Sequence, residues 1–397
     1  MSAKNGYAVG LDAGSAWTRA AICALDNGEL RFAGYGEAPS MAWNKGRLRD
    51  QTALSESIRQ AIREAEACAG VSVDSAVVGL GGSAVESASG SGLYEFGRLR
   101  EIEQGHLDAT VEMAAQLQSN RYIFQVLPQD FTVDGRAGYR NPLGVRAARL
   151  EANVCLMTTT MPEHQCLVDA VHQAHLAVEE TVFEAMAASY AAVLSADRAR
   201  GVAVVDIGAH STELIVYDGE ACVSACSLPV AGDHFSRDVA WRFTVSLEDA
   251  ERIKQQYGCA VLGLTADNSL IDVPTPDGRA PREAPRRDLN EVLEARAEEL
   301  FLFVREELAA AGMEQELMEG VILTGGGARL NGMCDMAERV LNCQARNGLP
   351  VGILGWPDPI NDPAWTTAAG LAMYSARLKH RHGANHGAPG LLGHLLR

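Results

Sequence analysis

The stretch Asp12-Ala-Gly-Ser-Ala-Trp-Thr18 recurs in the second half of the chain as Asp206-Ile-Gly-Ala-His-Ser-Thr212. Aspartate, glycine and threonine occupy identical offsets in the two copies. Each copy follows an apolar, strand-like run and precedes another one. A repeat of this kind is most simply explained by two related domains.

The residues around the first copy predict an α/β domain. Tyr7–Leu11 and Arg19–Leu25 are apolar runs that predict a hairpin with Asp12 near its tip. Apolar residues at helical spacing then predict a helix that ends at Gly70, and Ala76–Leu80 predicts a buried strand. Strands, a helix and a further strand in this order are typical of an α/β domain.

The second half repeats this pattern. Val202–Asp206 is a fully apolar strand-like run that ends in the aspartate of the second copy, and a later strand, Val321–Leu323, runs into a triple glycine. Between them we expect a long helix that is capped by Asn290 and ends at Gly312. A further helix is expected after Trp365.

The three strand ends are typical of a nucleotide site. Small residues let backbone N–H groups approach a phosphate, and an aspartate can hold a hydrated magnesium ion. One Asp-x-Gly is more often an ordinary β-turn, but two matched copies and a triple glycine favour nucleotide binding. We predict phosphate contacts at Ala13, Gly14, Ser15, Ala16, Gly208, Ala209, His210, Ser211 and Thr212, magnesium held through water by Asp12 and Asp206, and adenosine against Gly325, Gly326, Gly327 and Ala328.

Composition excludes several classes of protein. The formal net charge of −17 argues against general binding to nucleic acid, which needs a cationic face. No apolar run approaches the roughly 20 residues that span a bilayer, and the start does not look like a signal peptide. The nine cysteines lack metal-ligand spacing, so we expect reduced thiols in a cytoplasmic protein.

These loops resemble those of the superfamily of actin, sugar kinases and heat-shock-70 proteins, and within it the chain is most similar to the FtsA family. The resemblance covers about Tyr7 to Ser375. Its most specific segments are Val126-Leu-Pro-Gln-Asp-Phe-Thr-Val-Asp134 and Asn141-Pro-Leu-Gly144, which resemble the family's inserted subdomain 1C. Further matches are Asp249-Ala-Glu-Arg-Ile-Lys254 with Tyr257-Gly258, Val321-Ile-Leu-Thr-Gly-Gly-Gly327 and Thr367-Ala-Ala-Gly-Leu371.

The resemblance implies duplicated actin-like ATPase lobes with an insert in each, an α/β fold. Residues 1–84 and 161–198 would form subdomain 1A, with subdomain 1C inserted as residues 85–160. Residues 199–245 and 315–378 would form subdomain 2A, with subdomain 2B inserted as residues 246–314. Residues 379–397 would be a linker and an amphipathic membrane-targeting segment.

The resemblance also implies individual roles. Glu251 and Lys254 would contact the ribose and adenine; otherwise they are simply charges on a solvated helix. Glu184 would orient the water that attacks ATP, or else be an exposed helical carboxylate. Small residues near Ala188 and Ala369 would let two helices cross closely between the lobes as a hinge, or simply pack tightly.

The second phosphate loop departs from the family pattern. It reads Gly208-Ala209-His210, where the family usually has consecutive glycines. A Cβ at Ala209 and the imidazole of His210 narrow the phosphate pocket, or His210 donates to a phosphate instead. ATP binding is therefore expected, with at most weak hydrolysis.

The implied function is that of a filament-forming cell division protein. It would tether FtsZ to the cytoplasmic face of the cell membrane at the division site and recruit later division proteins through subdomain 1C. Arginines on subdomain 2B have the correct charge to bind the acidic, apolar FtsZ tail; the alternative is that they are simply solvated surface arginines. Leucines at the end of the chain would form the apolar face of a membrane helix; the alternative is a frayed terminus without a function. The candidates are Arg279, Arg282 and Arg296 for FtsZ, and Leu391, Leu392, Leu395 and Leu396 for lipid.

Two other functions are compatible with the nucleotide loops. An actin-like scaffold of a pilus or secretion machine would share them, but the segments that begin at Val126 and Asn141 argue against it. A small-molecule kinase on the same fold would need a catalytic aspartate in the first lobe, and the insert offers no convincing candidate.

Overall fold

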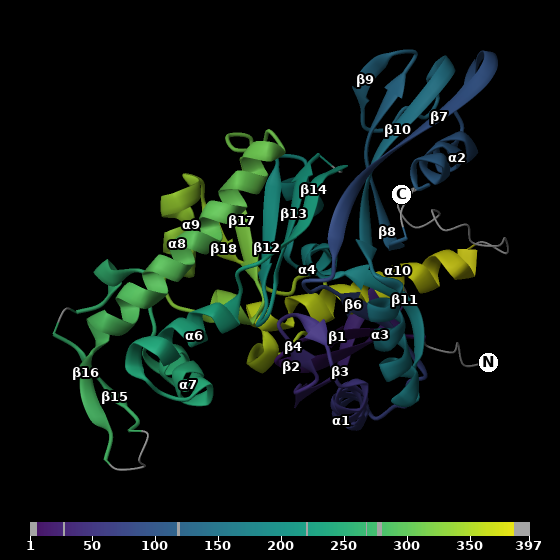
Figure 1. Cartoon of the computed structure of the whole chain (residues 1–397). Helices are drawn as coiled ribbons and strands as arrows, with labels where there is room; N and C mark the ends of the chain where they lie inside the picture. The colour runs from purple at the N-terminus through teal and green to yellow at the C-terminus, as the bar shows by residue number, and fades with distance from the viewer. Residues whose placement is uncertain are drawn as a thin grey trace.

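The computed structural model shows two lobes side by side and a third body that rises from the first lobe (Figure 1). The structure describes residues 6–26, 28–116, 120–219, 221–266, 268–275 and 280–384. None of the helices within these residues is both long enough and apolar enough to cross a membrane.

The first lobe is built on a five-stranded sheet in the order β11-β6-β1-β2-β3. The predicted hairpin is confirmed: β1 (Tyr7–Ala13) pairs antiparallel with β2 (Trp17–Asp26) and parallel with β6 (Ser75–Leu80). Helix α1 (Gln51–Ala69) ends, as expected, at Gly70, which has the left-handed conformation. It begins at Asp50, whose side chain caps it, a feature that was not predicted. The remaining elements of the lobe are β3 (Glu29–Pro39), β4 (Trp43–Asn44), β5 (Arg47–Leu48), α3 (Met161–Gln173) and β11 (Ala177–Phe183).

The second lobe repeats this arrangement strand for strand. Its sheet has the order β14-β13-β12-β17-β18, in which β12 (Val202–Ile207) pairs antiparallel with β13 (Thr212–Asp218) and parallel with β17 (Val321–Thr324). Strands β12, β13 and β17 therefore correspond to β1, β2 and β6. The lobe also contains α5 (Ser195–Arg198), β14 (Ala221–Leu228), α9 (Met333–Leu341) and β18 (Ala345–Asn347). The duplication inferred from the sequence is thus a duplication of topology.

The insert of the first lobe is a four-stranded sheet in the order β7-β10-β8-β9, with one helix packed on it. Its elements are β7 (Glu86–Glu101), α2 (Gln104–Ala114), β8 (Tyr122–Val133), β9 (Arg136–Tyr139) and β10 (Arg146–Thr159). The long strand β7 was not predicted from the sequence. That strand lies at the edge of the sheet, and most of its residues are exposed or partly exposed, so it lacks an apolar signal.

The insert of the second lobe holds a helical layer and a short hairpin, which extends away from the molecule in Figure 1. Its elements are α6 (Gly232–Phe243), α7 (Leu247–Tyr257), β15 (Leu270–Val273), β16 (Arg282–Pro285) and α8 (Arg286–Ala310). The predicted start of α8 is wrong, because the helix begins at Arg286, a turn before Asn290. Asn290 is fully buried; its side chain accepts the Cys259 N–H at 3.0 Å and donates to Thr265 Oγ1 at 2.8 Å.

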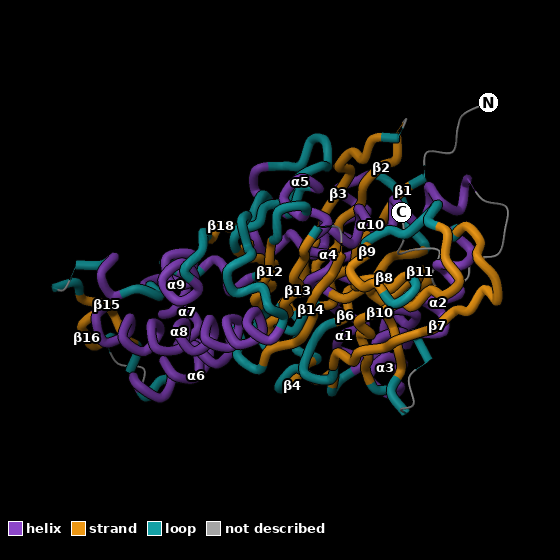
Figure 2. Tube along the Cα trace, turned by 90° about the horizontal axis from the view of Figure 1, so that it is seen from above, coloured by secondary structure: helices purple, strands orange, loops and turns teal. Residues whose placement is uncertain are grey.

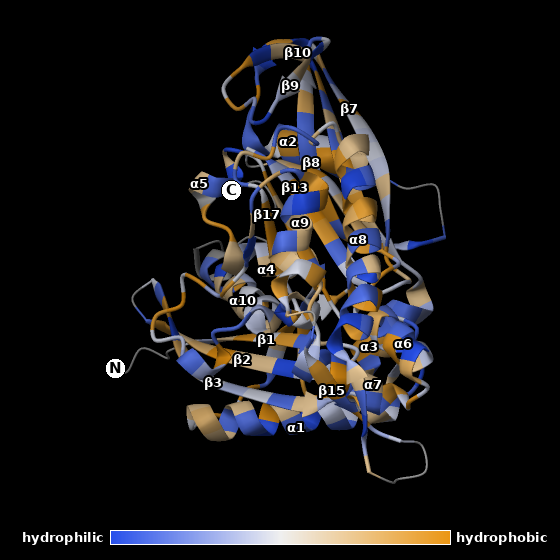
Figure 3. Ribbon diagram, turned by 90° about the vertical axis from the view of Figure 1, so that its left-hand side faces the viewer, coloured by the Kyte–Doolittle hydropathy of each residue, from blue (hydrophilic) through white to orange (hydrophobic). Residues whose placement is uncertain are grey.

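Two helices cross between the lobes. Helix α4 (Glu184–Ala192) leads from the first lobe to the second, and α10 (Thr366–Ala384) returns along the face of the first sheet opposite α1 (Figure 1). A Cβ added at Gly370 would lie 1.7 Å from the carbonyl oxygen of Ala187, so only glycine permits this close approach. Figure 2 shows α4 and α10 next to each other when the molecule is seen from above, and in Figure 3 strand β1 is mostly apolar, whereas α1 and α8 carry both polar and apolar residues.

A candidate nucleotide site between the lobes

A cleft of about 860 Å³ lies between the lobes. It is lined by the turn after β1, the turn after β12, the triple glycine after β17, and helices α6 and α7. Because the two lobes share one topology, equivalent strand ends face each other across this space. The structure thus brings together three loops that lie far apart in the sequence.

The two phosphate loops have matching geometry. A Cβ at Gly14 would lie 2.7 Å from the carbonyl oxygen of Trp17, and a Cβ at Gly208 would lie 2.8 Å from that of Ser211. The Gly208 N–H also donates to this Ser211 oxygen at 3.0 Å. Glycine is therefore required for the tightness of each turn, and the residues expected at phosphate that line the cleft are Ala13, Gly14, Ser15, Ala16, Gly208, Ala209 and Ser211.

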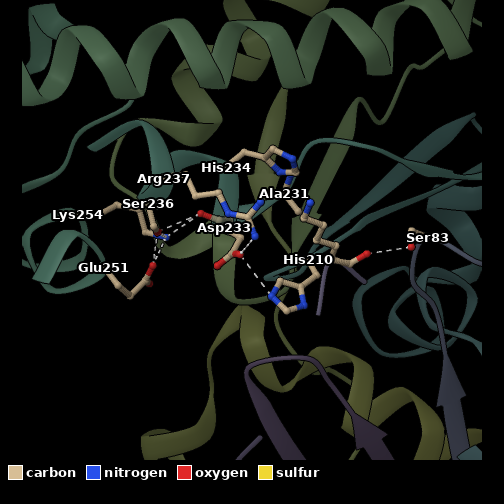
Figure 4. A network of polar contacts seen from close by, with 11 residues as sticks. Ser83, His210, Ala231, Asp233, His234, Ser236, Arg237, Glu251 and Lys254 are labelled. Atoms are coloured by element: carbon tan, nitrogen blue, oxygen red, sulfur yellow. Dashed lines mark hydrogen bonds and ion pairs between the residues drawn. The ribbon is translucent and has the colours of Figure 1, made fainter. Parts of the chain in front are cut away.

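Two predicted phosphate contacts lie elsewhere. Thr212 is fully buried, and its hydroxyl donates to the Val230 carbonyl at 2.7 Å, so it holds the loop instead of facing the cleft. The His210 ring lines a neighbouring pocket, where Nε2 lies 3.4 Å from Asp233 Oδ2 (Figure 4). The first turn of α6 holds the second phosphate loop in place, since the Asp233 N–H donates to the Ala209 carbonyl at 2.7 Å.

Four carboxyl groups gather at the floor of the cleft. Burial raises the pKa of Asp12 to about 7; Arg19 acts to lower it, and Asp206 adds to the rise. Burial also raises the pKa of Asp206, against a 2.7 Å hydrogen bond from the Thr367 hydroxyl. Glu184 and Glu213 complete the group. So many carboxyl groups in one buried place favour binding of a cation.

Glu184 is the first residue of α4 and faces this floor, so it is not an exposed helical carboxylate. A Cβ added at Gly81 would lie 2.2 Å from Glu184 Oε2 and 2.8 Å from Glu213 Oε1. The pKa of Glu184 is well above its usual value because of burial, then the neighbouring charges of Glu213, Asp12 and Asp206.

Sequence reasoning missed Glu213. Its carboxylate accepts the Gly82 N–H at 2.9 Å, and burial with the charge of Asp206 raises its pKa to about 7. The available signal was a carboxylate directly after the second phosphate loop, followed in the same strand by the apolar run Leu214–Tyr217. Other missed residues that line the cleft include Trp17, Arg19, Gln255, Arg329, Asn331 and Thr367.

Glu251 and Lys254 lie together at the wall formed by α7 (Figure 4). The Lys254 ammonium lies 2.7 Å from Glu251 Oε2 and donates to Ser236 Oγ at 2.9 Å and to the Gly232 carbonyl at 3.1 Å. Burial acts to raise the pKa of Glu251, but Lys254 and hydrogen bonds from Ser236 and Gln255 lower it overall. Lys254 is therefore held within the cleft wall, whereas 40% of the Glu251 side chain stays exposed to solvent.

The triple glycine closes the third side of the cleft. Gly325 has φ +80°, and a Cβ there would lie 2.4 Å from Asp206 Oδ1. A Cβ at Gly326 would meet nothing within 4 Å, so this glycine presents open backbone to the cleft. Gly327 also lines the cleft, whereas Ala328 is buried behind it.

The three arginines expected on subdomain 2B have different positions. Arg296 on α8 lies 2.6 Å from Asp238 and also pairs with Glu299, so its charge is already compensated. Arg282 on β16 donates to the Phe243 carbonyl at 2.9 Å and lies over the Phe243 ring. Arg279 and the four terminal leucines, Leu391, Leu392, Leu395 and Leu396, lie outside the described residues.

Comparison with known proteins assigns the family. Residues 203–370 match the family model "Cell division protein FtsA", and residues 82–158 match the model "SHS2 domain inserted in FTSA". The chain is 32% identical over 369 residues to the cell division protein FtsA of Pseudomonas aeruginosa, covering 92% of this chain and 88% of the relative. It is also 32% identical to FtsA of Escherichia coli K12, covering 92% and 89%.

The chain belongs to the FtsA family. This confirms the resemblance to the FtsA family that was inferred from the sequence. Membership of this family supports a role in cell division. FtsA of Borreliella burgdorferi is equally similar, at 32% identity over 92% of this chain and 90% of the relative.

Solved structures confirm the actin-like fold of this FtsA-family chain. The PilM–PilN complex of type IV pilus biogenesis has a TM-score of 0.68 at 17% identity, covering 93% of this chain and 98% of the other. MreB5 of Spiroplasma citri, solved with ADP bound, has a TM-score of 0.57 at 14% identity, covering 96% and 99%. At these identities the likeness concerns the fold alone.

The cleft residues of this FtsA-family chain fit a magnesium nucleotide. Glycine-dependent turns on both sides leave backbone at the surface, and Asp12 and Asp206 stand at the ends of equivalent strands. Within the described residues, no group of three or more His, Cys, Asp or Glu side chains is arranged to hold a metal ion. A Mg²⁺ ion that keeps most of its ligands as water and phosphate oxygens needs no such group.

Proposed function

We propose that this chain binds ATP with Mg²⁺ in the interlobe cleft and works as a nucleotide-dependent division scaffold. The observation that carries the proposal is the meeting of duplicated phosphate loops and a triple glycine around one cleft, in a chain of the FtsA family. Asp12 and Asp206 would hold the hydrated ion, Glu251 and Lys254 the nucleoside, and Glu184 the attacking water. Hydrolysis is slow, because Ala209 and His210 stand where the family usually has glycines.

The proposed scaffold forms filaments, tethers FtsZ to the cytoplasmic face of the cell membrane and recruits later division proteins through the insert of the first lobe. Family membership supports this role over a pilus scaffold, because the pilus protein shares only the fold. Lipid contact is assigned to Leu391, Leu392, Leu395 and Leu396. A tail this short binds weakly alone, so attachment depends on many tails displayed by one polymer.

Cosedimentation with anionic lipid vesicles tests the tether. The full-length protein and a variant truncated after Ala388 are compared with and without ATP and Mg²⁺, and FtsZ is added in a second series. We expect full-length protein to pellet with vesicles and carry FtsZ down, and the truncated variant to lose vesicle binding. If neither vesicles nor FtsZ are retained under any nucleotide condition, the tether proposal fails.

The FtsZ tail is proposed to dock on subdomain 2B, near Arg279 and Arg282. Of the two described arginines, Arg282 is the better candidate, since Arg296 is already paired with Asp238 and Glu299. Arg282→Glu should weaken binding of an FtsZ tail peptide about tenfold or more in fluorescence anisotropy, through charge reversal. Arg305→Glu on α8 is the charge-matched control; equal weakening by both variants would indicate only nonspecific attraction.

A further inference from the structure

A second pocket, of about 410 Å³, lies beside the nucleotide cleft on the other side of the second phosphate loop. We call it the His210 pocket. The first lobe contributes Lys45 and Ser83, and the second contributes His210, Asp233, His234 and Arg237. Asp233 lines both this pocket and the cleft, so the two spaces adjoin there. Nothing in the proposed nucleotide site uses the basic side chains of this pocket.

The charges of the His210 pocket favour an anion. Arg237 donates to Asp233 Oδ2 at 2.8 Å, and His210 Nε2 lies 3.4 Å from the same oxygen (Figure 4). These contacts hold the pKa of Asp233 below its usual value, the hydrogen bond with His210 having the largest effect. The negative charge of Asp233, the carboxylate that lines the pocket, is therefore already compensated. Lys45 makes no ion pair within the part of the chain that the structure describes. The lining of the pocket therefore has a positive formal charge even with neutral imidazoles, from Lys45 and Arg237 against Asp233, although the chain as a whole carries −17.

The pocket is also held in shape without a ligand. Lys45 lies at the turn between β4 and β5 with φ +50°, and Ser83 fixes that turn by donating to the Lys45 carbonyl at 3.1 Å. Across the lobes, Ser227 Oγ donates to the Gly82 carbonyl at 3.4 Å. Basic groups on ordered backbone recognise an anion with little loss of conformational freedom.

We propose that the His210 pocket binds a phosphate-sized oxyanion between Lys45 of the first lobe and Arg237 and His210 of the second. Arginine and lysine together with an imidazole donor are groups that bind tetrahedral oxyanions. Such an anion bridges the lobes and touches the rear of the second phosphate loop. An anion held by residues of both lobes stabilises the arrangement of the lobes seen here. Only an effect of the anion on nucleotide binding rests on the proposed function; the anion site itself does not.

Equilibrium dialysis of the full chain against radiolabelled inorganic phosphate tests the site. Ionic strength is kept constant with chloride, and nucleotide is absent in the first series. We expect one saturable site, weakened about tenfold by Arg237→Gln and by Lys45→Gln, because each removes a charge-assisted hydrogen bond. Asp233→Asn should instead tighten binding several-fold, since it removes the one competing negative charge. Arg200→Gln, which removes another arginine paired with a carboxylate, should leave binding unchanged.

A second series adds saturating Mg·AMPPNP to distinguish the two spaces. Phosphate binding that persists and stays sensitive to Arg237→Gln supports a site outside the cleft. Absence of saturable binding, equal effects of Arg237→Gln and Arg200→Gln, or complete displacement by the nucleotide overturns the proposal. Melting temperatures identify misfolded variants. If Arg237→Gln or Lys45→Gln does not fold, the isosteric variant Asp233→Asn still tests the proposal.

Nucleotide binding is measured separately with a fluorescent ATP analogue. If the chain binds phosphate with the expected variant pattern but does not bind ATP, the proposed function fails and the oxyanion site stands. If it binds ATP but shows no phosphate site, the reverse holds.

Discussion

At the scale of single residues, the cleft is defined by buried charges. Asp12, Glu184, Asp206 and Glu213 share its floor, and Arg19 lies beside Asp12. Burial raises the pKa of all four carboxyl groups. Buried carboxyl groups whose pKa is raised lower the stability of the nucleotide-free protein, and they favour binding of a cation. Proteins often lose stability at a functional site in this way.

Glu213→Gln should stabilise the nucleotide-free protein at alkaline pH. The folded-state pKa of Glu213 is about 7, above the ordinary value of 4.5. Folding therefore favours the protonated form, and wild-type stability falls as pH rises from about 4.5 through about 7. Glutamine keeps the acceptor for Gly82 and removes this loss. Urea titrations should show a gain on the order of 1–3 kcal/mol at pH 8.5 and almost none at pH 5; a pH-independent gain would contradict this account.

Lys254→Gln should weaken ATP binding. The Lys254 ammonium is ordered at the cleft wall by Glu251, Ser236 and the Gly232 carbonyl, so its loss removes a charge and also releases the carboxylate of Glu251. A rise of about tenfold in Kd is expected in titrations with a fluorescent ATP analogue. Arg252→Gln on the same helix is the control, because Arg252 pairs with Asp249 away from the cleft.

At the scale of elements, the crossing of α4 and α10 sets how the lobes meet. The helices are in contact because Gly370 lets the Ala187 carbonyl approach, and Gly10 of β1 likewise lets the Ala368 carbonyl approach. The small residues expected in a hinge therefore have a definite packing role. Whether the crossing also bends during a nucleotide cycle stays a prediction.

Gly370→Ala should destabilise the protein strongly. The new Cβ would lie 1.7 Å from a backbone oxygen, so α4 and α10 must separate. A loss of about 3 kcal/mol or more is expected in chemical denaturation. Gly105→Ala in α2 is the matched control: nothing lies within 4 Å of its Cβ, and alanine there is neutral or stabilising by up to about 1 kcal/mol. Similar losses in the two variants would show that the crossing is not the cause.

At the scale of the whole molecule, one cleft depends on both lobes. Each lobe supplies a strand–turn–strand unit, and the insert of the first lobe also reaches the second: Gln129 donates to the Val223 carbonyl at 2.8 Å, and Arg140 pairs with Asp218. A ligand that contacts both lobes therefore stabilises their arrangement as a unit.

Mg·ATP should raise the melting temperature of the whole chain in a single transition. At a concentration one hundred times Kd, the stabilisation is about 2.7 kcal/mol. EDTA should return the transition most of the way to that of the nucleotide-free protein, because the floor carboxylates repel phosphate without the cation. Differential scanning calorimetry measures this; a shift that survives EDTA unchanged would contradict a role for Asp12 and Asp206 in holding magnesium.

The sequence by itself determined the duplication, the strands and turns at Asp12 and Asp206, and the glycine-rich third loop, because these depend on local apolar runs and on glycines that tight turns require. It also determined the family, through specific segments in the first insert.

Only the tertiary structure decided which side chains meet. Glu213 became a cleft residue and His210 faced a separate pocket because strand pairing and α6 set those directions. Asn290 was buried inside α8, where Cys259 satisfies it, instead of capping the helix. The positions of these three side chains depend on hydrogen-bond and charge partners that are distant in the sequence. A local sequence pattern carries no information on the burial or charge of those partners.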